Sequence, residues 1–255
     1  MKRIRVIPVL LINNRRLVKT VQFKNEVYIG DPVNALKIFN DKCVDEILIL
    51  DISRKPKYAR PDFDYIRQLA GECFMPMAYG GGIADFNQAE QIFQCGVEKV
   101  VLNSSITKSP KLISDISFKY GAQSVVASID IKKNWLGKEF PFIMNGTKRI
   151  NADVVEYARN AVKSGAGEVF INFIDRDGMF SGYDLKLINR IAEQLSVPLV
   201  ACGGAESVND FYKAAVQGAS AVAAGSMFVF KSKQRGILIN YPDEKTLMND
   251  LYSKL

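Results

Sequence analysis

The feature that most limits how this chain can fold is an alternation, repeated eight times, between short apolar runs and longer segments with helical periodicity. The runs are rich in β-branched residues, as is typical of buried strands. The predicted strands are Arg5–Leu10, Glu46–Asp51, Met75–Tyr79, Lys99–Asn103, Ser124–Asp130, Glu168–Ile174, Pro198–Cys202 and Ala221–Gly225. Since no compositional break interrupts the 255 residues, the pattern predicts one domain over residues 1–255, an α/β (βα)₈ TIM barrel.

The second half of the chain repeats features of the first half. Gly81-Gly82 follows the third predicted strand and Gly203-Gly204 follows the seventh. Asn103-Ser104 ends the fourth strand and Gly225-Ser226 ends the eighth, and both pairs of motifs are 122 residues apart. The shared offset at equivalent strand ends predicts a barrel built from two similar half-barrels.

Composition excludes several kinds of chemistry. The chain has no histidine, so it can hold neither a nucleophile activated by histidine nor a metal bound by histidine. Its four cysteines form no CxxC motif, which favours a reduced cytoplasmic protein without a metal or cofactor.

The net charge of +7 suits an anionic metabolite better than nucleic acid, because the basic residues do not alternate with aromatic ones. No apolar run approaches the ~18 residues that span a bilayer, so we expect no membrane association.

The glycine pairs point to a phosphorylated ligand. Glycine lets the backbone approach an anion closely, and strands seven and eight carry the usual phosphate site of such barrels. The repeat on strands three and four predicts a second site across the same rim. Tight turns would also explain any single glycine, but four matched positions favour a ligand with a phosphate at each end.

Acidic side chains follow several predicted strands on that rim. Asp130 directly follows an apolar run and is the favoured acid–base residue, whereas Asp51 and Asp177 are candidates for catalytic support. Each of these carboxylates could instead cap a helix or stabilise a turn. Lys19 lies on a long connection, residues 12–32, which we expect to form a small strand or hairpin and to close over the ligand.

Several motifs together resemble one known family. They are RVIP (5–8), LVK (17–19), GDP (30–32), LDIS (50–53), YGGGI (79–83), KVVLNSS (99–105), SIDIK (128–132), FIDRDGMFSGYD (173–184), CGGA (202–205) and AGSMF (224–228). Over essentially its whole length the chain resembles the cyclase subunit of imidazole glycerol phosphate synthase, the HisF family.

The resemblance implies an enzyme subunit that forms a heterodimer with a HisH-like glutaminase and uses its ammonia on a phosphorylated substrate. It implies one phosphate site at Gly82, Asn103 and Ser104 and another at Gly204, Gly225 and Ser226, with Lys19 contacting the substrate. It also implies an ammonia gate at the amino-terminal end of the barrel, formed by four charged residues that begin strands one, two, four and six. These are Arg5, Glu46, Lys99 and Glu168.

One difference from the family bears directly on the reaction. The family's catalytic pair is an aspartate at the end of strand one and an aspartate at the end of strand five. Asp130 supplies the second, but Leu11 stands at the first position, and leucine cannot transfer a proton. The tail GILINYP (236–242) resembles a divergent branch associated with surface polysaccharides.

The resemblance to that branch implies a subunit whose ammonia converts the acetamido group of a nucleotide sugar into an acetamidino group, and Leu11 and the tail favour this function. The alternatives are cyclase activity in histidine biosynthesis and a non-catalytic scaffold that activates a glutaminase. An isomerase of the related barrel type is disfavoured, because it would not need the charged gate.

Overall fold

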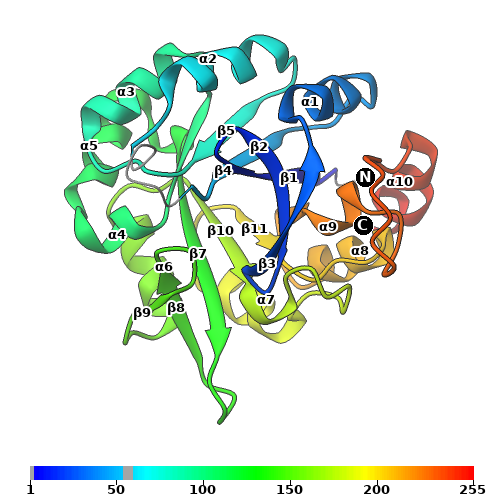
Figure 1. Cartoon of the computed structure of the whole chain (residues 1–255). Coiled ribbons are helices and arrows are strands. Elements are labelled where there is room, and N and C mark those ends of the chain that lie inside the picture. Colours follow the sequence, from blue (N-terminus) through cyan, green and yellow to red (C-terminus); the bar gives the residue numbers. More distant parts are fainter. Residues whose placement is uncertain (1–2, 54–59) are drawn as a thin grey trace.

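The computed structural model describes residues 3–53 and 60–255, and in it eight parallel strands close into a barrel (Figure 1). In order around the barrel they are β1 (Arg5–Asn13), β4 (Ile47–Asp51), β5 (Met77–Gly80), β6 (Lys99–Leu102), β7 (Val125–Lys133), β10 (Glu168–Phe173), β11 (Leu199–Cys202) and β12 (Ala221–Ala224). Strand β12 pairs with β1, which completes the closure. The predicted TIM barrel and all eight of its strands are therefore confirmed.

Helices lie around the outside of the barrel (Figure 1). The longer ones are α1 (Pro32–Asp41), α2 (Phe63–Glu72), α3 (Phe86–Gln94), α5 (Lys111–Tyr120), α6 (Val154–Lys163), α7 (Leu185–Ala192), α8 (Val208–Val216) and α10 (Glu244–Asp250). Most of them begin after an aspartate whose carboxylate accepts a backbone N–H of the first turn, for example Asp31 before α1 and Asp85 before α3. Such caps satisfy N–H groups that have no partner within the helix. No helix in the described part of the chain is long and apolar enough to cross a membrane.

Two antiparallel extensions rise from the carboxyl ends of the strands. Strands β2 (Arg16–Val21) and β3 (Lys24–Gly30) continue from β1, so the predicted hairpin in the first long connection is present. Strand β8 (Glu139–Ile143) pairs with the extended end of β7, and β9 (Lys148–Arg149) pairs with β8. Both extensions belong to the rim on which the sequence predicts the ligand site.

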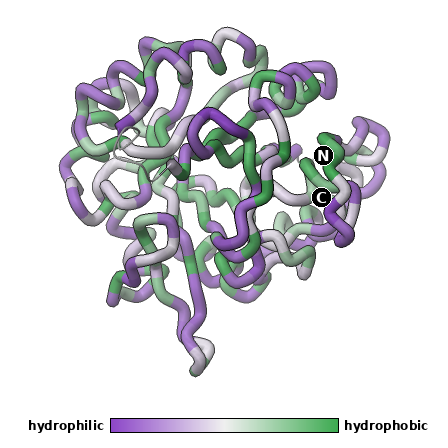
Figure 2. Tube along the Cα trace, in the orientation of Figure 1, coloured by the Kyte–Doolittle hydropathy of each residue, from purple (hydrophilic) through white to green (hydrophobic). Residues whose placement is uncertain are grey.

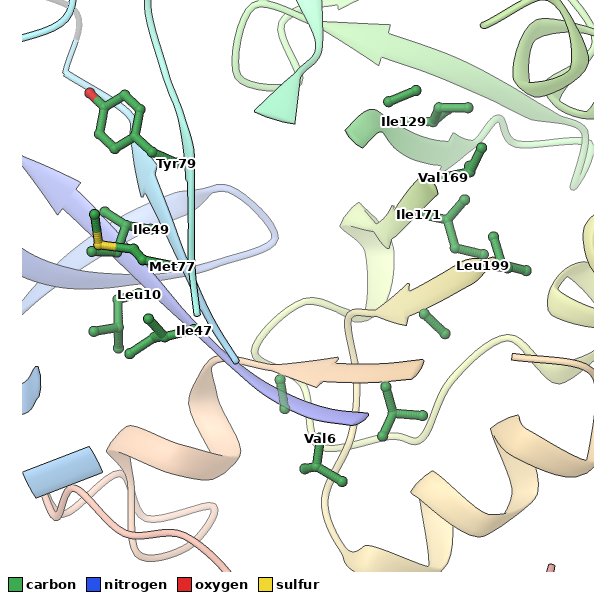
Figure 3. Close-up of a cluster of buried hydrophobic side chains, with 14 of the residues drawn as sticks. Val6, Leu10, Ile47, Ile49, Met77, Tyr79, Ile129, Val169, Ile171 and Leu199 are labelled. Carbon is green, nitrogen blue, oxygen red and sulfur yellow. The ribbon is translucent and has the colours of Figure 1, made fainter. Parts of the chain in front are cut away.

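The strands bury side chains on both faces, as parallel sheets covered by helices do. Outward-facing residues such as Ile49, Tyr79 and Ile171 form the core between strands and helices (Figure 3). Inward-facing residues form a second cluster inside the barrel, which includes Ile7, Leu48 and Phe170. Figure 2 shows the hydrophobic stretches concentrated at the centre of the molecule.

The two half-barrels correspond residue for residue over a long stretch. Each bound of β5, α3 and β6 recurs 122 residues later as a bound of β11, α8 and β12. The short helices α4 (Ser104–Lys108) and α9 (Ser226–Val229) start at the same offset. The residues before them, Asn103 and Gly225, adopt similar backbone angles, with φ −119° and ψ −80° against φ −105° and ψ −68°. The half-barrel prediction is confirmed.

Truncation of a core side chain tests the packing between helices and barrel. Phe39 on α1 is fully buried, whereas Phe118 on α5 is 94% exposed. We expect Phe39→Ala to lower the free energy of unfolding by about 3–5 kcal/mol, because it removes buried apolar surface and leaves a cavity. The matched variant Phe118→Ala should change it by no more than about 0.5 kcal/mol. Urea denaturation followed by circular dichroism measures both, and equal effects would contradict the packing.

Candidate functional site

A buried ion pair lies at the mouth of the barrel. Lys19 of β2 places its Nζ 2.9 Å from both carboxylate oxygens of Asp177 and 3.0 Å from the carbonyl oxygen of Thr20. Lys19 is 4% exposed and Asp177 is 6% exposed. Removing two charges from water is costly unless both are paired and hydrogen-bonded, and this geometry meets that condition. The hairpin that carries Lys19 is thereby joined to the loop after β10.

Asp130 points into the mouth from the end of β7, beside this pair. Asn103 Nδ2 donates to its Oδ2 over 3.3 Å. Burial raises the pKa of Asp130 to about 7, and the negative charge of Asp177 adds to the increase. A carboxyl group with such a pKa can both accept and release a proton near neutral pH, which is what general acid–base chemistry requires.

The predicted phosphate-site residues of β11 and β12 line a small pocket at the same rim. Its lining is Asp177, Gly178, Phe180, Gly203, Gly204, Ala205, Ala224, Gly225 and Ser226. The hydroxyl of Ser226 is buried and has no hydrogen-bond partner among the described residues. A Cβ atom on Gly225 would lie 3.0 Å from Lys19 Cε, so the lysine side chain packs closely against this glycine. The pocket therefore brings together glycine backbone, the buried Ser226 hydroxyl and the charged side chain of Lys19.

The equivalent residues of the other half-barrel are less buried but make more hydrogen bonds within the protein. Asn103 Nδ2 also donates to the carbonyl oxygen of Ser128 over 3.1 Å. Ser104 Oγ accepts the backbone N–H of Met144 over 3.1 Å, so the turn between β8 and β9 lies over this position. Gly82 lies in the turn after β5 with φ +68°. The Ser104 hydroxyl hydrogen, which points to Asn103 Oδ1 over 3.4 Å, could turn to a ligand while the bond from Met144 stays in place.

Asp51 and Asp177, which the sequence does not rank, have different surroundings. Asp51 accepts the backbone N–H of Ser53 over 2.9 Å and the hydroxyl of Tyr79 over 3.4 Å. Burial raises its pKa. Asp177, in contrast, forms an ion pair with Lys19, and its negative charge raises the pKa of Asp130. Of the two, Asp177 is the one that the fold brings to the Lys19–Asp130 group.

Leu11 occupies an inward-facing position at the same mouth. It belongs to the apolar cluster inside the barrel and is 9% exposed. Its strand neighbours are Leu50 on β4 and Val18 on β2. The side of the mouth opposite Asp130 is therefore lined with hydrocarbon at the position where the resemblance predicts a carboxylate.

The four charged residues at the other end of the barrel form a closed ring. The Arg5 guanidinium donates to the carboxylates of both Glu46 and Glu168. Lys99 Nζ lies 2.9 and 3.0 Å from the two Glu46 oxygens and 3.1 Å from Glu168 Oε2. Both glutamates are 5% exposed, so the ring closes the floor of the barrel with alternating charges.

Sequence reasoning passed over one polar residue of the barrel interior. Asn172 is the inward-facing residue of β10 that follows Phe170, and it is 5% exposed. The signal was present in the sequence, because an amide stands in the otherwise apolar run VFINFI. Buried polar groups are normally hydrogen-bonded, and the side-chain oxygen of Asn172 has no partner among the described residues.

Comparison with known proteins places this barrel in a family. The family model described as "Histidine biosynthesis protein" matches residues 5–234. The chain therefore belongs to this family of barrel enzymes.

Individual relatives narrow the assignment. A protein of Pseudomonas aeruginosa named "Putative imidazole glycerol phosphate synthase subunit hisF2" is 48% identical, over 97% of this chain and 99% of its own length. The correspondingly named hisF3 of Vibrio vulnificus is 46% identical over 95% and 94%. The imidazole glycerol phosphate synthase subunit HisF of Alkaliphilus metalliredigens is 37% identical over 88% and 89%. Within the family, the chain belongs with the HisF subunits.

The raised pKa of Asp130 predicts how stability depends on pH. Because the pKa rises from its ordinary 3.8 to about 7, the folded protein holds a proton at this group that the unfolded chain has lost between those two values. The free energy of unfolding should therefore fall as pH rises through this window. Asp130→Asn has no carboxyl group to lose this proton, so we expect it to exceed the native protein in stability by about 4 kcal/mol near pH 8 and to match it near pH 4.

Urea denaturation across this pH range measures the difference. Asp115→Asn on α5, where the aspartate side chain is 42% exposed, is the matched control and should follow the native profile. Parallel profiles for the native protein and Asp130→Asn would contradict the assignment.

Proposed function

We propose that this protein is the ammonia-using subunit of a cytoplasmic heterodimer with a glutaminase, and that it converts the acetamido group of a nucleotide sugar into an acetamidino group. The observation that carries the proposal is the mouth of the barrel, where Asp130 has a pKa near neutrality and faces Leu11 instead of a second carboxylate. A reaction that needs two carboxylates is disfavoured there, whereas proton transfer by one group remains available.

Ammonia would enter through the floor and meet the substrate at the mouth. Its nitrogen attacks the amide carbon, the carbon–oxygen bond breaks and the oxygen leaves as water. Asp130 carries two protons in turn from the attacking nitrogen to the oxygen, so that the amidine forms as the oxygen leaves as water. Lys19 offers a positive charge to the phosphorylated part of the ligand and Asp177 holds Lys19 in place.

Two phosphate-binding positions suit a ligand with phosphate groups at separate points. Gly204, Gly225 and Ser226 would hold one group, and Gly82, Asn103 and Ser104 would hold the other. The buried hydroxyl of Ser226, which has no partner among the residues described, supports a ligand that completes its hydrogen bonding.

The names of the relatives are compatible with a divergent branch. Relatives that are 44–48% identical carry a qualified name, whereas those at 36–38% are named HisF subunits without qualification. Cyclase activity in histidine biosynthesis is the second candidate, which the fold and the closed ring of charges favour and Leu11 opposes. A non-catalytic scaffold is disfavoured, because it would not need the ionisable group at Asp130.

Replacement of Asp130 tests the assigned chemistry. With ¹⁵N-ammonium and acetamido nucleotide sugars, the native chain should incorporate label, as detected by mass spectrometry. Asp130→Asn should reduce turnover by about 10²–10⁴-fold, because the general acid–base group is lost. Asp115→Asn should retain native turnover. Full activity of Asp130→Asn on the substrate would overturn its role, and efficient imidazole formation from the bisphosphorylated ribonucleotide would overturn the choice of substrate.

The ring of charges predicts an effect on how well ammonia released by the glutaminase is used by this chain. Glu46→Gln removes one charge from the floor, so we expect the ratio of glutamine-dependent to ammonium-dependent activity to fall severalfold while the complex with the glutaminase still forms. Size-exclusion chromatography and the two assays measure these quantities. Failure of the native chain to associate with any glutaminase of its own cell would argue against the heterodimer.

A further inference from the structure

One strand connects the floor of the barrel to its mouth through three successive inward-facing residues. On β10, Glu168 belongs to the charged ring, Phe170 belongs to the apolar cluster of the barrel interior, and Asn172 follows. At about 3.3 Å per residue, Asn172 lies roughly 13 Å above Glu168. A small molecule that passed the ring would cross one apolar layer and then meet this amide.

The amide has an unused acceptor. Asn172 is 5% exposed, and its Oδ1 is buried without a hydrogen-bond partner among the described residues. The oxygen lies close to Gly203, where a Cβ atom would approach it to 2.8 Å. Its strand neighbours are Asp130 on β7 and Cys202 on β11, so the amide lies beside the proposed acid–base group.

The other polar amide of the interior is already occupied. Asn103 Nδ2 is within hydrogen-bond distance of Ser128, Asp130 and Phe142. Across the barrel from β10, the inward-facing residues of β1 and β4 are the hydrocarbons Leu11 and Leu50. Polar groups therefore line one wall of the passage, and Asn172 is the member of that wall whose acceptor is unpaired.

We propose that Asn172 is an ammonia-binding residue, whose side-chain oxygen accepts an N–H of ammonia that has crossed the barrel and holds it beside Asp130. Burial restricts the occupant to a small donor, since a sugar or phosphate group cannot reach a side chain so enclosed. Ammonia provides three N–H donors and a lone pair that stays free to attack. The inference rests on the proposed use of ammonia and assigns the residue that positions it.

Steady-state kinetics of two variants test this role. Asn172→Leu has a similar shape but no acceptor, so the KM for ammonium should rise about tenfold, which corresponds to about 1.4 kcal/mol. The affinity for the phosphorylated substrate should not change. Asn172→Asp keeps an oxygen acceptor and should retain a KM closer to the native value. A native KM for ammonium in Asn172→Leu would overturn the proposal, as would an equal loss of affinity for the phosphorylated substrate.

A binding measurement tests Asn172 without any knowledge of the substrate. The protein is labelled with ¹⁵N at asparagine, and the NMR signal of the Asn172 side-chain amide is assigned by its absence in Asn172→Leu. This signal should shift saturably on titration with ammonium chloride and not with sodium chloride. The absence of an ammonium-specific shift would mean that water alone occupies the position and would overturn the proposal. If the native chain forms no ammonia-dependent product, the proposed function fails, and the titration still decides whether Asn172 binds ammonia.

Discussion

Hydrogen bonds between β12 and β1 and between β7 and β10 close the sheet, and this closure determines which ends of the strands meet. All eight barrel strands run in the same direction, so every amino end lies at the floor and every carboxyl end lies at the mouth. Four charged residues from distant parts of the sequence therefore form one ring, and Lys19, Asp130 and Asp177 share the other rim. The apolar interior of the barrel lies between these two polar regions. Because the strands are parallel and the sheet is closed, the two regions lie at opposite ends of the same barrel.

The two polar regions solve the problem of buried charge in different ways. At the floor, each glutamate has two cationic partners, so the ring is fully paired and closes the barrel. At the mouth, Lys19 and Asp177 neutralise each other, whereas Asp130 pairs with no cation among the described residues and its pKa rises to about 7. A paired group is suited to structure and gating, and an unpaired group with a shifted pKa is suited to proton transfer. Leu11 places a hydrocarbon side chain on the side of the mouth that faces Asp130.

The fold was largely predictable because its signal is local and repeated. Each strand is an apolar run, and the offset of 122 residues revealed the half-barrels before any contact was known. The site was less predictable, because its properties depend on contacts between distant segments. The sequence could not rank Asp177 above Asp51, since that ranking depends on Lys19, 158 residues away. It also gave no sign that Met144 lies over Ser104 or that the oxygen of Asn172 lacks a partner among the described residues.

The central claim is that a barrel with Leu11 in place of one of the family's two catalytic aspartates directs ammonia to a sugar amide. The most direct test offers the native heterodimer both the bisphosphorylated ribonucleotide and a set of acetamido nucleotide sugars, with glutamine labelled at its amide nitrogen. Mass spectrometry then shows where the label goes. We predict label in an acetamidino sugar and none in an imidazole. Label in the imidazole product alone would contradict the account and would show that the reaction proceeds with Leu11 in place of the aspartate.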